Sequence, residues 1–245
     1  MVATPLSTPI AKRTSPMATP RAEATHARAK KAAPISAKQA ASTPGTRAAK
    51  HLAAADARFE PLIKAHGVLE LAGVKDEPTA FAYLLKAIVH QQLASKAAAK
   101  IHGRVLAALQ AEPPTPAAVL AAPLASLRSA GLSERKASYI VDLATHFGDG
   151  RLGDDMLSKA SDEELREALL RVKGIGPTTC ESFLIFQLGR PDVLPTGNLA
   201  VRKGLAKFLG SAEAPSADDM ERLSRSWRPH RSFASYYLWK SACTK

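Results

Sequence analysis

Apolar residues recur every three or four positions along most of the chain after residue 50. This spacing places them on one face of an α-helix, so each stripe predicts a helix with one buried side. The clearest stripes are Phe81, Leu84, Leu85, Ile88 and Leu93, then Ile101, Val105 and Leu109, and finally Tyr139, Ile140, Leu143, Ala144 and Phe147. No segment alternates apolar and polar residues with the period of two that a half-buried strand needs. The pattern therefore predicts an all-α domain.

Proline and glycine divide this helical pattern into separate elements. Pro113, Pro114 and Pro116 interrupt the chain before a short helix near 117–120, because proline cannot continue a preceding helix. A second break falls at 131–133, which reads Gly-Leu-Ser. Helices of about 11–12 residues with their loops then give roughly eight to ten helices in the domain.

Residues 1–50 lack this periodicity. They are rich in Ala, Thr, Ser, Pro and basic residues and contain few large apolar side chains. Such a segment buries too little apolar surface to fold, so we predict a disordered tail at 1–50 and one helical domain at 51–245. The tail fits an organelle transit peptide, for a chloroplast or mitochondrion. It fits equally a DNA-contacting or nuclear-targeting segment, or an inert extension.

The chain carries a net charge of +12. An anionic partner, most commonly nucleic acid, is the first expectation for a protein this basic. The predicted tail holds nine Lys or Arg and one Glu, a net of +8, which leaves +4 of the +12 for the helical domain. Charge alone therefore does not identify the partner.

The cysteine content argues against several kinds of site. Cys180 and Cys243 are the only cysteines, which excludes a disulfide framework and the ligand spacing of a zinc or iron–sulfur site. We therefore expect a reducing compartment and no metal centre. We also expect no membrane partner, since no apolar run approaches the roughly 20 residues that a membrane span needs.

A helix, a glycine turn and a second helix follow one another at 161–188. Ser161 and Glu164 have the spacing of a capping box, which starts the first helix. The turn reads Lys-Gly-Ile-Gly at 173–176, and Pro177 suits the first position of the next helix. The apolar run at 183–188 predicts that this second helix is buried on most sides.

The turn has the chemistry of a clamp for a DNA backbone. Gly174 and Gly176 let the backbone turn tightly and approach a partner closely, while Ile175 between them can anchor the turn in the core. The free amides at the start of the second helix suit a phosphate oxygen, and Lys173 adds a positive charge beside them. The alternative is an ordinary connection between two helices.

The turn lies in a longer segment that resembles a known family. Val-Lys-Gly-Ile-Gly-Pro at 172–177 and Phe-Leu-Ile-Phe-Gln-Leu-Gly-Arg-Pro-Asp-Val-Leu-Pro at 183–195 resemble the helix-hairpin-helix (HhH-GPD) superfamily of DNA glycosylases. Its 3-methyladenine DNA glycosylase II (alkylbase) branch is the most similar, especially the plant and algal form. Further blocks match in consistent order between about residues 55 and 243, at 89–98, 131–139, 199–204 and 227–232. The resemblance implies a two-lobed helical fold.

The resemblance also implies a function in base-excision repair. Family members flip a damaged nucleotide out of double-stranded DNA into a pocket between two lobes and cleave the bond between base and sugar. The expected enzyme is a monofunctional hydrolase that excises alkylated purines such as 3-methyladenine and 7-methylguanine. We expect a monomer in the nucleus, without a cofactor except for a monovalent cation that the family resemblance would place at the hairpin.

The position of the family's catalytic aspartate is occupied here by Asn198, in the segment Leu-Pro-Thr-Gly-Asn-Leu at 194–199. In the family a carboxylate stabilises the oxocarbenium-like transition state. The neutral amide of Asn198 can hold a water or the sugar but offers no negative charge. Two hypotheses stay open: a slow glycosylase, and a catalytically impaired pseudo-enzyme that binds damaged DNA. Of the other acids considered, Asp192 is interpreted as a turn or capping residue, and Glu181 is the weaker candidate.

Other positions take roles from the same resemblance. Thr178 replaces the Schiff-base Lys of bifunctional members and the Trp that usually lines the alkylbase pocket, so lyase chemistry by that route is excluded. Gln91 and Gln92 are expected near the opened DNA, with a capping or core hydrogen bond as the alternative. Arg202 and Lys203 are expected at phosphates, or else on a solvated face.

The missing aromatic wall at Thr178 needs a substitute if the pocket is to stack a base. Phe81, Tyr83 and Trp239 are the aromatic candidates. Packing in the core is the interpretation that we prefer for all three.

Overall fold

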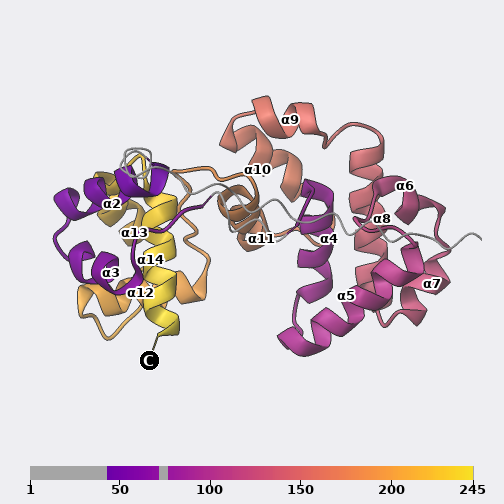
Figure 1. Ribbon diagram of the computed structural model, residues 1–245, viewed down its shortest axis with the longest axis horizontal. Coiled ribbons are helices and arrows are strands. Elements are labelled where there is room, and N and C mark those ends of the chain that lie inside the picture. The colour runs from indigo at the N-terminus through magenta and orange to yellow at the C-terminus, as the bar shows by residue number, and fades with distance from the viewer. Residues whose placement is uncertain (1–42, 72–76, 245) are drawn as a thin grey trace, which may run out of the picture. The chain divides into compact units, whose positions relative to one another are not determined.

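The computed structural model describes residues 43–71 and 77–244, and the regular elements in these ranges are helices (Figure 1). In chain order they are α2 (Pro44–Ala55), α3 (Phe59–His66), α4 (Ala80–His90), α5 (Ser95–Leu109), α6 (Pro116–Ala121), α7 (Leu124–Ser129), α8 (Glu134–Gly148), α9 (Asp154–Lys159), α10 (Asp162–Leu170), α11 (Pro177–Ser182), the π-helix η1 (Phe183–Gln187), α12 (Leu199–Leu209), α13 (Ala217–Leu223), the 3₁₀-helix η2 (Ser224–Trp227) and α14 (Arg231–Cys243). No helix in the described ranges is long and apolar enough to cross a membrane.

The all-α prediction is confirmed, but the predicted number of helices was too low. The described residues form thirteen α-helices. Four of them, α6, α7, α9 and α11, have only six residues each. Helices this short contain less than two turns, so their apolar residues do not repeat often enough to form a stripe.

The folded domain begins earlier than residue 51. Thr43 caps α2, its side chain accepting from the amide of Thr46 at 3.2 Å. The helix then buries Ala48, Ala49 and Leu52. The expected boundary was therefore wrong for residues 44–50, because small alanines make this buried face and hide it from a search for large apolar side chains. The rest of the predicted tail lies outside the described residues.

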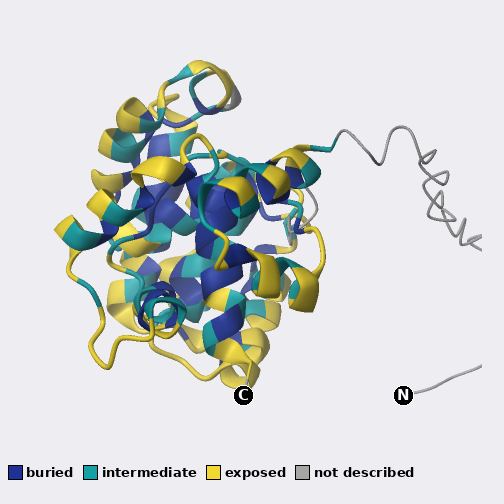
Figure 2. Cartoon of the chain, turned by 90° about the vertical axis from the view of Figure 1, so that its left-hand side faces the viewer, coloured by how far each residue is buried: buried dark blue, intermediate teal, exposed yellow. Residues whose placement is uncertain are grey.

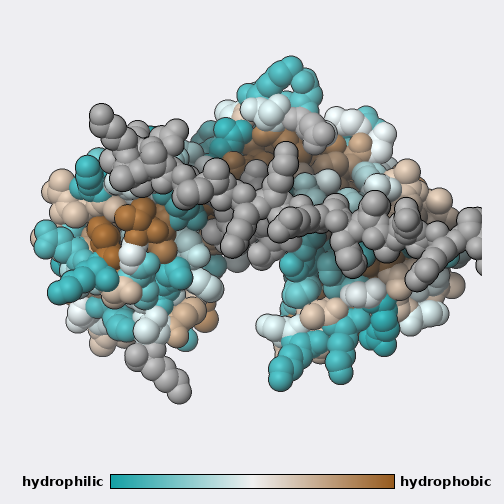
Figure 3. Space-filling view, viewed as in Figure 1, coloured by the Kyte–Doolittle hydropathy of each residue, from teal (hydrophilic) through white to brown (hydrophobic). Residues whose placement is uncertain are grey.

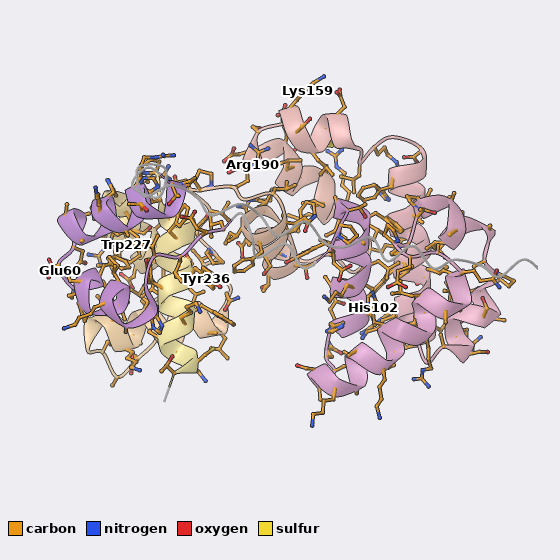
Figure 4. All side chains as sticks on the ribbon, viewed as in Figure 1. Glu60, His102, Lys159, Arg190, Trp227 and Tyr236 are labelled. Atoms are coloured by element: carbon orange, nitrogen blue, oxygen red, sulfur yellow. The ribbon has the colours of Figure 1, made fainter. Side chains whose placement is uncertain are left out.

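Helices from both ends of the described chain form one group, here called the terminal lobe. α2 and α3 pack on α14, and α12 packs along α14. The rings of Phe59 and Trp227 meet edge to face at 5.1 Å in its core, and Tyr237 lies fully buried beside them. Figure 4 labels Trp227 among these helices. The edge-to-face geometry is one that aromatic pairs prefer, and it adds to the burial of their large surfaces.

The intervening helices, α4 to η1, form a second group, here called the middle lobe. α8 lies at its centre and packs against α4, α6 and α7. It buries Ala137, Ile140, Leu143 and Ala144, the residues of the predicted stripe or next to it. Figure 2, in which the side that carries α2 and α3 faces the viewer, shows that the helices there also bury their inner sides. All the described helices belong to one unit.

The predicted stripes on α5 and α8 are confirmed. The stripe on α4 needs a correction. Phe81, Leu84, Leu85 and Ile88 are buried on α4. Leu93 is instead 40% exposed, because α4 ends at His90 and Gln92 turns the chain with a left-handed φ of 56°. The helical period does not continue through such a turn.

The crossing of α12 and α14 depends on a residue without a side chain. A Cβ on Gly204 would lie 2.0 Å from the backbone oxygen of Leu238. The two helix backbones therefore approach closely at this point. The atoms that an added Cβ would meet belong to the backbone, so no flexible side chain could move aside to make room.

Gly204→Ala is expected to destabilise the protein by about 1–3 kcal/mol, because the added methyl overpacks the α12–α14 contact. Gly103→Ala is the matched control, since a Cβ there meets no atom within 4 Å and lies in a helix. That control should stabilise the protein by about 0.5–1 kcal/mol. Urea unfolding of both variants checks the pair; equal stability of the Gly204 variant and the parent protein would contradict the close contact.

Candidate functional site

The turn at 173–176 joins α10 and α11 as expected. The predicted capping box is present: Ser161 caps the amide of Glu164, and the Glu164 carboxylate accepts from the amide of Ser161 at 2.8 Å. Gly174 has a left-handed φ of 84°, which favours glycine. Ile175 is only 5% exposed and anchors the turn in the core. Gly176 is the N-cap of α11, and a Cβ there would meet open space.

Helix α8 fixes the position of this turn. The Tyr139 ring lies so close to Gly174 that a Cβ would come within 2.2 Å of it. The Asp142 carboxylate accepts from the amide of Lys173 at 2.9 Å, and its other oxygen lies 3.5 Å from the Lys173 ammonium. The Lys173 side chain is nevertheless 70% exposed. An exposed pair of this kind is weak, so Lys173 stays available to an anion.

The two glutamines beyond α4 have different environments. Gln91 donates from Nε2 to the carbonyl oxygen of Gly174 at 2.7 Å, so it braces the turn. Lys136 of α8 donates to the carbonyls of Val89 and Gln91 at 2.7 and 2.6 Å and holds the end of α4. Gln92 is exposed and borders a depression of about 200 Å³ beside the turn. The expectation of a DNA-proximal side chain therefore fits Gln92 better than Gln91.

Asn198 caps the start of α12. Its Oδ1 accepts from the amides of Ala200 and Val201 at 3.0 and 3.1 Å. A helix N-terminus carries partial positive charge, so this oxygen is held by two donors and the side chain is fixed. Asn198 is only partly buried, which leaves its amide group within reach of solvent.

Thr178 and the segment that ends at Asn198 come together. The Thr178 hydroxyl would lie 3.6 Å from a Cβ on Gly197, the residue before Asn198. Thr178 is exposed at the start of α11. The two departures from the family pattern therefore border the same small region of surface.

The segment that leads to Asn198 is clamped by the first turn of α14. Asp192 binds Arg231 through its carboxylate at 3.0 Å and through its carbonyl oxygen at 2.9 Å. The Ser232 hydroxyl accepts from the amide of Val193 at 2.9 Å and donates to the carbonyl of Arg190 at 2.7 Å. The interpretation of Asp192 as a turn and capping residue is confirmed, because both carboxylate oxygens are engaged with arginines.

The open face of α11 and η1 continues from Thr178 along the helix. Ser182 and Phe186 follow at four-residue intervals and are only partly buried, whereas most of their neighbours are buried. The Phe186 ring contacts Tyr236 of α14 at 5.5 Å, and Tyr236 contacts Trp239 at 6.0 Å. The wider turn of a π-helix, frequent at functional sites, keeps this face aligned.

These aromatic residues correct the sequence interpretation. Trp239 was assigned to the core but is 40% exposed. Phe81 is buried, as expected, and the ring of Tyr83 packs against Phe183 at 5.6 Å. Phe186 and Tyr236 were not predicted as residues of the site. Their partial exposure depends on how η1 meets α14, and the spacing of apolar residues along one helix does not report on such a contact.

Figure 3 shows a hollow in this region. It opens at the lower edge in that view, between the surface that carries α12 and α14 and the surface that carries α4 and α5. Tyr236 lies on the side of α14 toward α11 and this hollow (Figure 4). The aromatic rings of α14 and η1, with Phe186 and Tyr236 edge to face at 78°, therefore provide an apolar wall that Thr178 cannot.

The two cations on α12 differ in their partners. The Arg202 guanidinium donates to the carbonyl oxygen of Pro215 at 3.1 Å and so holds the loop after α12. Lys203 is exposed. Of the two residues expected at phosphates, Lys203 has the more accessible side chain.

The described residues give little support for a metal site or a reactive thiol. No three His, Cys, Asp or Glu side chains gather there in a way that would hold a metal ion. Burial raises the pKa of the Cys180 thiol to about 11, so it stays protonated at neutral pH. In the turn, the carbonyls of Val172 and Gly174 already accept from Ile175 and Gln91. The carbonyls of Lys173 and Ile175 are the remaining oxygens that could hold a monovalent cation.

A family model and several known proteins resemble this chain. The model of the HhH-GPD superfamily base excision DNA repair proteins matches residues 85–229. The DNA-3-methyladenine glycosylase 1 of Schizosaccharomyces pombe is 31% identical over 199 residues, which cover 80% of this chain and 87% of that protein. The Bacillus subtilis protein YfjP is 30% identical over 164 residues, 64% of this chain, and the match spans only 57% of that longer protein.

Solved structures share the fold. The DNA-3-methyladenine glycosidase of Bacillus halodurans superposes with a TM-score of 0.74 at 33% identity, over 83% of this chain and 91% of its own. The S. pombe 3-methyladenine DNA glycosylase in complex with abasic DNA superposes with a TM-score of 0.67 at 31% identity, over 80% of this chain and 96% of its own. The matched residues 85–229 contain the turn, Thr178 and Asn198.

Glu181 is excluded from this surface by burial. It is about 5% exposed on α11 and faces Arg166, whose guanidinium lies 3.4 Å from one carboxylate oxygen. The other oxygen has no hydrogen-bond partner in the described structure. Burial raises the pKa of the Glu181 carboxyl, against the opposing effect of Arg166. It therefore acts as a structural residue and does not reach the open face.

The raised pKa of Glu181 gives stability a specific pH dependence. A carboxyl whose folded pKa exceeds its unfolded value stabilises the fold at low pH, and this contribution is lost as pH rises through the folded pKa. The unfolding free energy of the parent protein minus that of Glu181→Gln should therefore fall as pH increases from about 4 to neutral. Urea titrations at several pH values measure it, with the exposed Glu167→Gln as control; a difference that grows with pH would contradict this environment.

Proposed function

Because the chain belongs to the HhH-GPD superfamily of base excision DNA repair proteins, we propose that it is a monofunctional DNA glycosylase that excises alkylated purines from double-stranded DNA. The observation that carries the proposal is the position of Asn198. It caps α12 next to Thr178, on the surface that continues into the open aromatic face of η1 and α14. A sugar held at Asn198 would thus place its base toward these rings.

The turn at 173–176 is the proposed contact to the DNA backbone. Gly176 starts α11 with open space around its Cα, so a phosphate oxygen can approach the amides at the start of this helix. Lys173 is exposed beside them. Contacts of this kind fix the position of DNA but do not read its sequence.

The proposed substrate class follows from the aromatic wall. Alkylated purines such as 3-methyladenine are electron-poor and positively charged. The Trp239 ring, which is 40% exposed, offers a face of negative electrostatic potential that favours a stacked cation. The neighbouring Tyr236 ring already attracts a cation, since the Lys240 ammonium lies 5.3 Å from its centre. Such a base is already a good leaving group, so the site needs little acid catalysis.

The absence of a carboxylate at Asn198 limits the proposed rate. Its Oδ1 is occupied by two amides, and its amide group can only hold a water or the sugar. An enzyme with Asn at this position therefore lacks the charge that stabilises an oxocarbenium-like transition state. By comparison with the loss of one preorganised electrostatic group, the cost is about 3–4 kcal/mol, on the order of a hundred- to thousandfold in rate.

The same observation supports a second candidate function. A protein with the DNA clamp and the aromatic wall, but without a carboxylate at Asn198, would bind damaged DNA and recruit other repair proteins. Thr178, which supplies neither a Schiff-base amine nor an aromatic ring, favours this pseudo-enzyme over an active member with a single substitution.

Asn198→Asp is expected to raise the rate of base release a hundred- to thousandfold, or about 3–4 kcal/mol in the barrier. An Asp there keeps one oxygen for the amides of α12, and the helix N-terminus favours its ionised form. Asn198→Ser is the control, since serine also caps helices but carries no charge. Release of 3-methyladenine and 7-methylguanine from methylated DNA is the measurement.

The outcomes of that experiment separate the two functions. Release by the parent protein well above the rate in buffer alone would overturn the pseudo-enzyme. Release only by Asn198→Asp would support it and leave the pocket intact. No release by any variant would contradict the proposal that Asn198 alone limits an otherwise complete site.

Gly174→Val and Gly176→Val should weaken binding to damaged and undamaged duplexes alike, because the turn holds phosphates and not bases.

The two glycine variants should differ in stability. Gly174→Val adds a side chain against Tyr139 at a left-handed φ and should cost about 1–3 kcal/mol or more. Gly176→Val has space and extended backbone, so it should change stability by less than about 0.5 kcal/mol. Binding by anisotropy and urea unfolding test both; a loss confined to damaged DNA would sink the assignment.

A further inference from the structure

One face of α5 carries three cations at regular intervals. Lys96, Lys100 and Arg104 follow one another every four residues and all three are exposed. They form what is here called the α5 stripe. Figure 4 shows nitrogen-tipped side chains along the lower edge of α5, and Figure 3 shows the same edge as hydrophilic. The hollow described above opens on this side of the molecule.

The α5 stripe is electrostatically unfavourable in the protein alone. Helix Ser95–Leu109 contains no Asp or Glu, so no opposite charge lies one turn away on the same helix. Like charges four residues apart repel each other. Lys96 also lies in the first turn, where the helix dipole disfavours a cation. An ordinary solvated helix face mixes both signs of charge, whereas on this face a bound anion would relieve the repulsion.

The rest of this face is nearly flat. Gly103 and Ala107 lie one position before and three after Arg104 and are exposed. A Cβ on Gly103 would meet no atom within 4 Å. Small residues on the same face as the cations allow a rod-like partner to approach the helix backbone closely, while the longer basic side chains reach around it.

The α5 stripe is continuous with the proposed DNA interface. It begins four residues after the exposed Gln92. The Arg104 guanidinium lies over Gly131, where a Cβ would come within 2.8 Å of its terminal nitrogen. Gly131 and Gln92 border the same depression beside the turn. A duplex held at the turn would therefore extend toward the stripe.

We propose that Lys96, Lys100 and Arg104 bind phosphates of the DNA duplex that flanks the lesion. Four helical residues rise by about 6 Å, so the three cations span about 12 Å in a line. One DNA strand presents a phosphate every 3.4 Å or so of helix axis, so this line faces roughly three or four phosphates. A regular row of cations fits a regular polyanion better than it fits the irregular charges of an acidic protein. The inference rests on the proposed DNA function and extends its surface.

The test is the salt dependence of binding. The full chain and the triple variant Lys96→Gln, Lys100→Gln, Arg104→Gln are titrated by fluorescence anisotropy with a duplex of roughly two turns (about 21 base pairs). The duplex carries a central abasic-site analogue, and salt runs from about 50 to 200 mM. The slope of log K against log salt should fall in magnitude by about 0.9 for each phosphate that the variant no longer neutralises, or about 2–3 for the triple.

Two further variants make the result specific. Lys64→Gln, Lys159→Gln, Arg222→Gln removes the same charge from exposed positions on other elements and should change the slope by less than about 0.9, the equivalent of a single phosphate. Lys96→Arg, Lys100→Arg, Arg104→Lys keeps the charges and should keep the slope, which shows that the slope depends on the charge and not on the particular side chain. Circular dichroism of each variant accompanies the titrations.

The outcomes are distinguishable from those of the proposed function. Equal slopes for the stripe triple and the control triple would overturn the stripe while leaving base release untouched. Equal DNA slopes combined with stripe-dependent binding to polyglutamate would assign the surface to an acidic protein and also overturn it. Failure of the parent protein to bind DNA at all would overturn the proposed function together with the stripe.

Discussion

The position of the turn between α10 and α11 depends on a contact that only glycine permits. The Tyr139 ring fills the space that a side chain on Gly174 would occupy, and the Asp142 carboxylate holds the neighbouring amide of Lys173. Gln91 braces the same glycine from its carbonyl side. Two elements, α8 and the residue that follows α4, therefore hold the turn on either side of Gly174. The amides at the start of α11 follow this turn, so their position depends on these contacts.

Much of the architecture could be predicted from the sequence, because helix faces and caps are local features. The stripe of α4, the capping box at Ser161 and the buried Ile175 all follow from spacing within a few residues. The buried face of α2 and the exposure of Trp239 did not follow. Both depend on which element packs against the helix. Neither small alanines nor a single tryptophan forms a stripe of large apolar residues that would indicate such a partner.

The candidate site shows the same division between local and non-local information. The sequence located Asn198 and Thr178, and the structure adds that their segments approach each other at Gly197. The sequence treated Gln91 and Gln92 as a pair, whereas one braces the turn and the other is exposed. Under the proposed function Asn198 has two roles that conflict: its oxygen completes the helix cap, while its neutral amide lacks the charge that the proposed reaction favours. On that proposal one residue satisfies the fold and still weakens the reaction.

The composition of the terminal lobe has a consequence for synthesis. α2 and α3 pack against α14, α2 also packs against η2, and Phe59 of α3 contacts Phe208 of α12 at 4.7 Å. Residues that are synthesised earlier therefore wait for residues that are synthesised more than a hundred positions later. The middle lobe is continuous in sequence and can fold while the ribosome is still adding the final helices. During that interval the apolar faces of α2 and α3 have no partner. The small, alanine-rich side of α2 exposes little apolar surface over this delay, which limits the aggregation that large unpartnered side chains would invite.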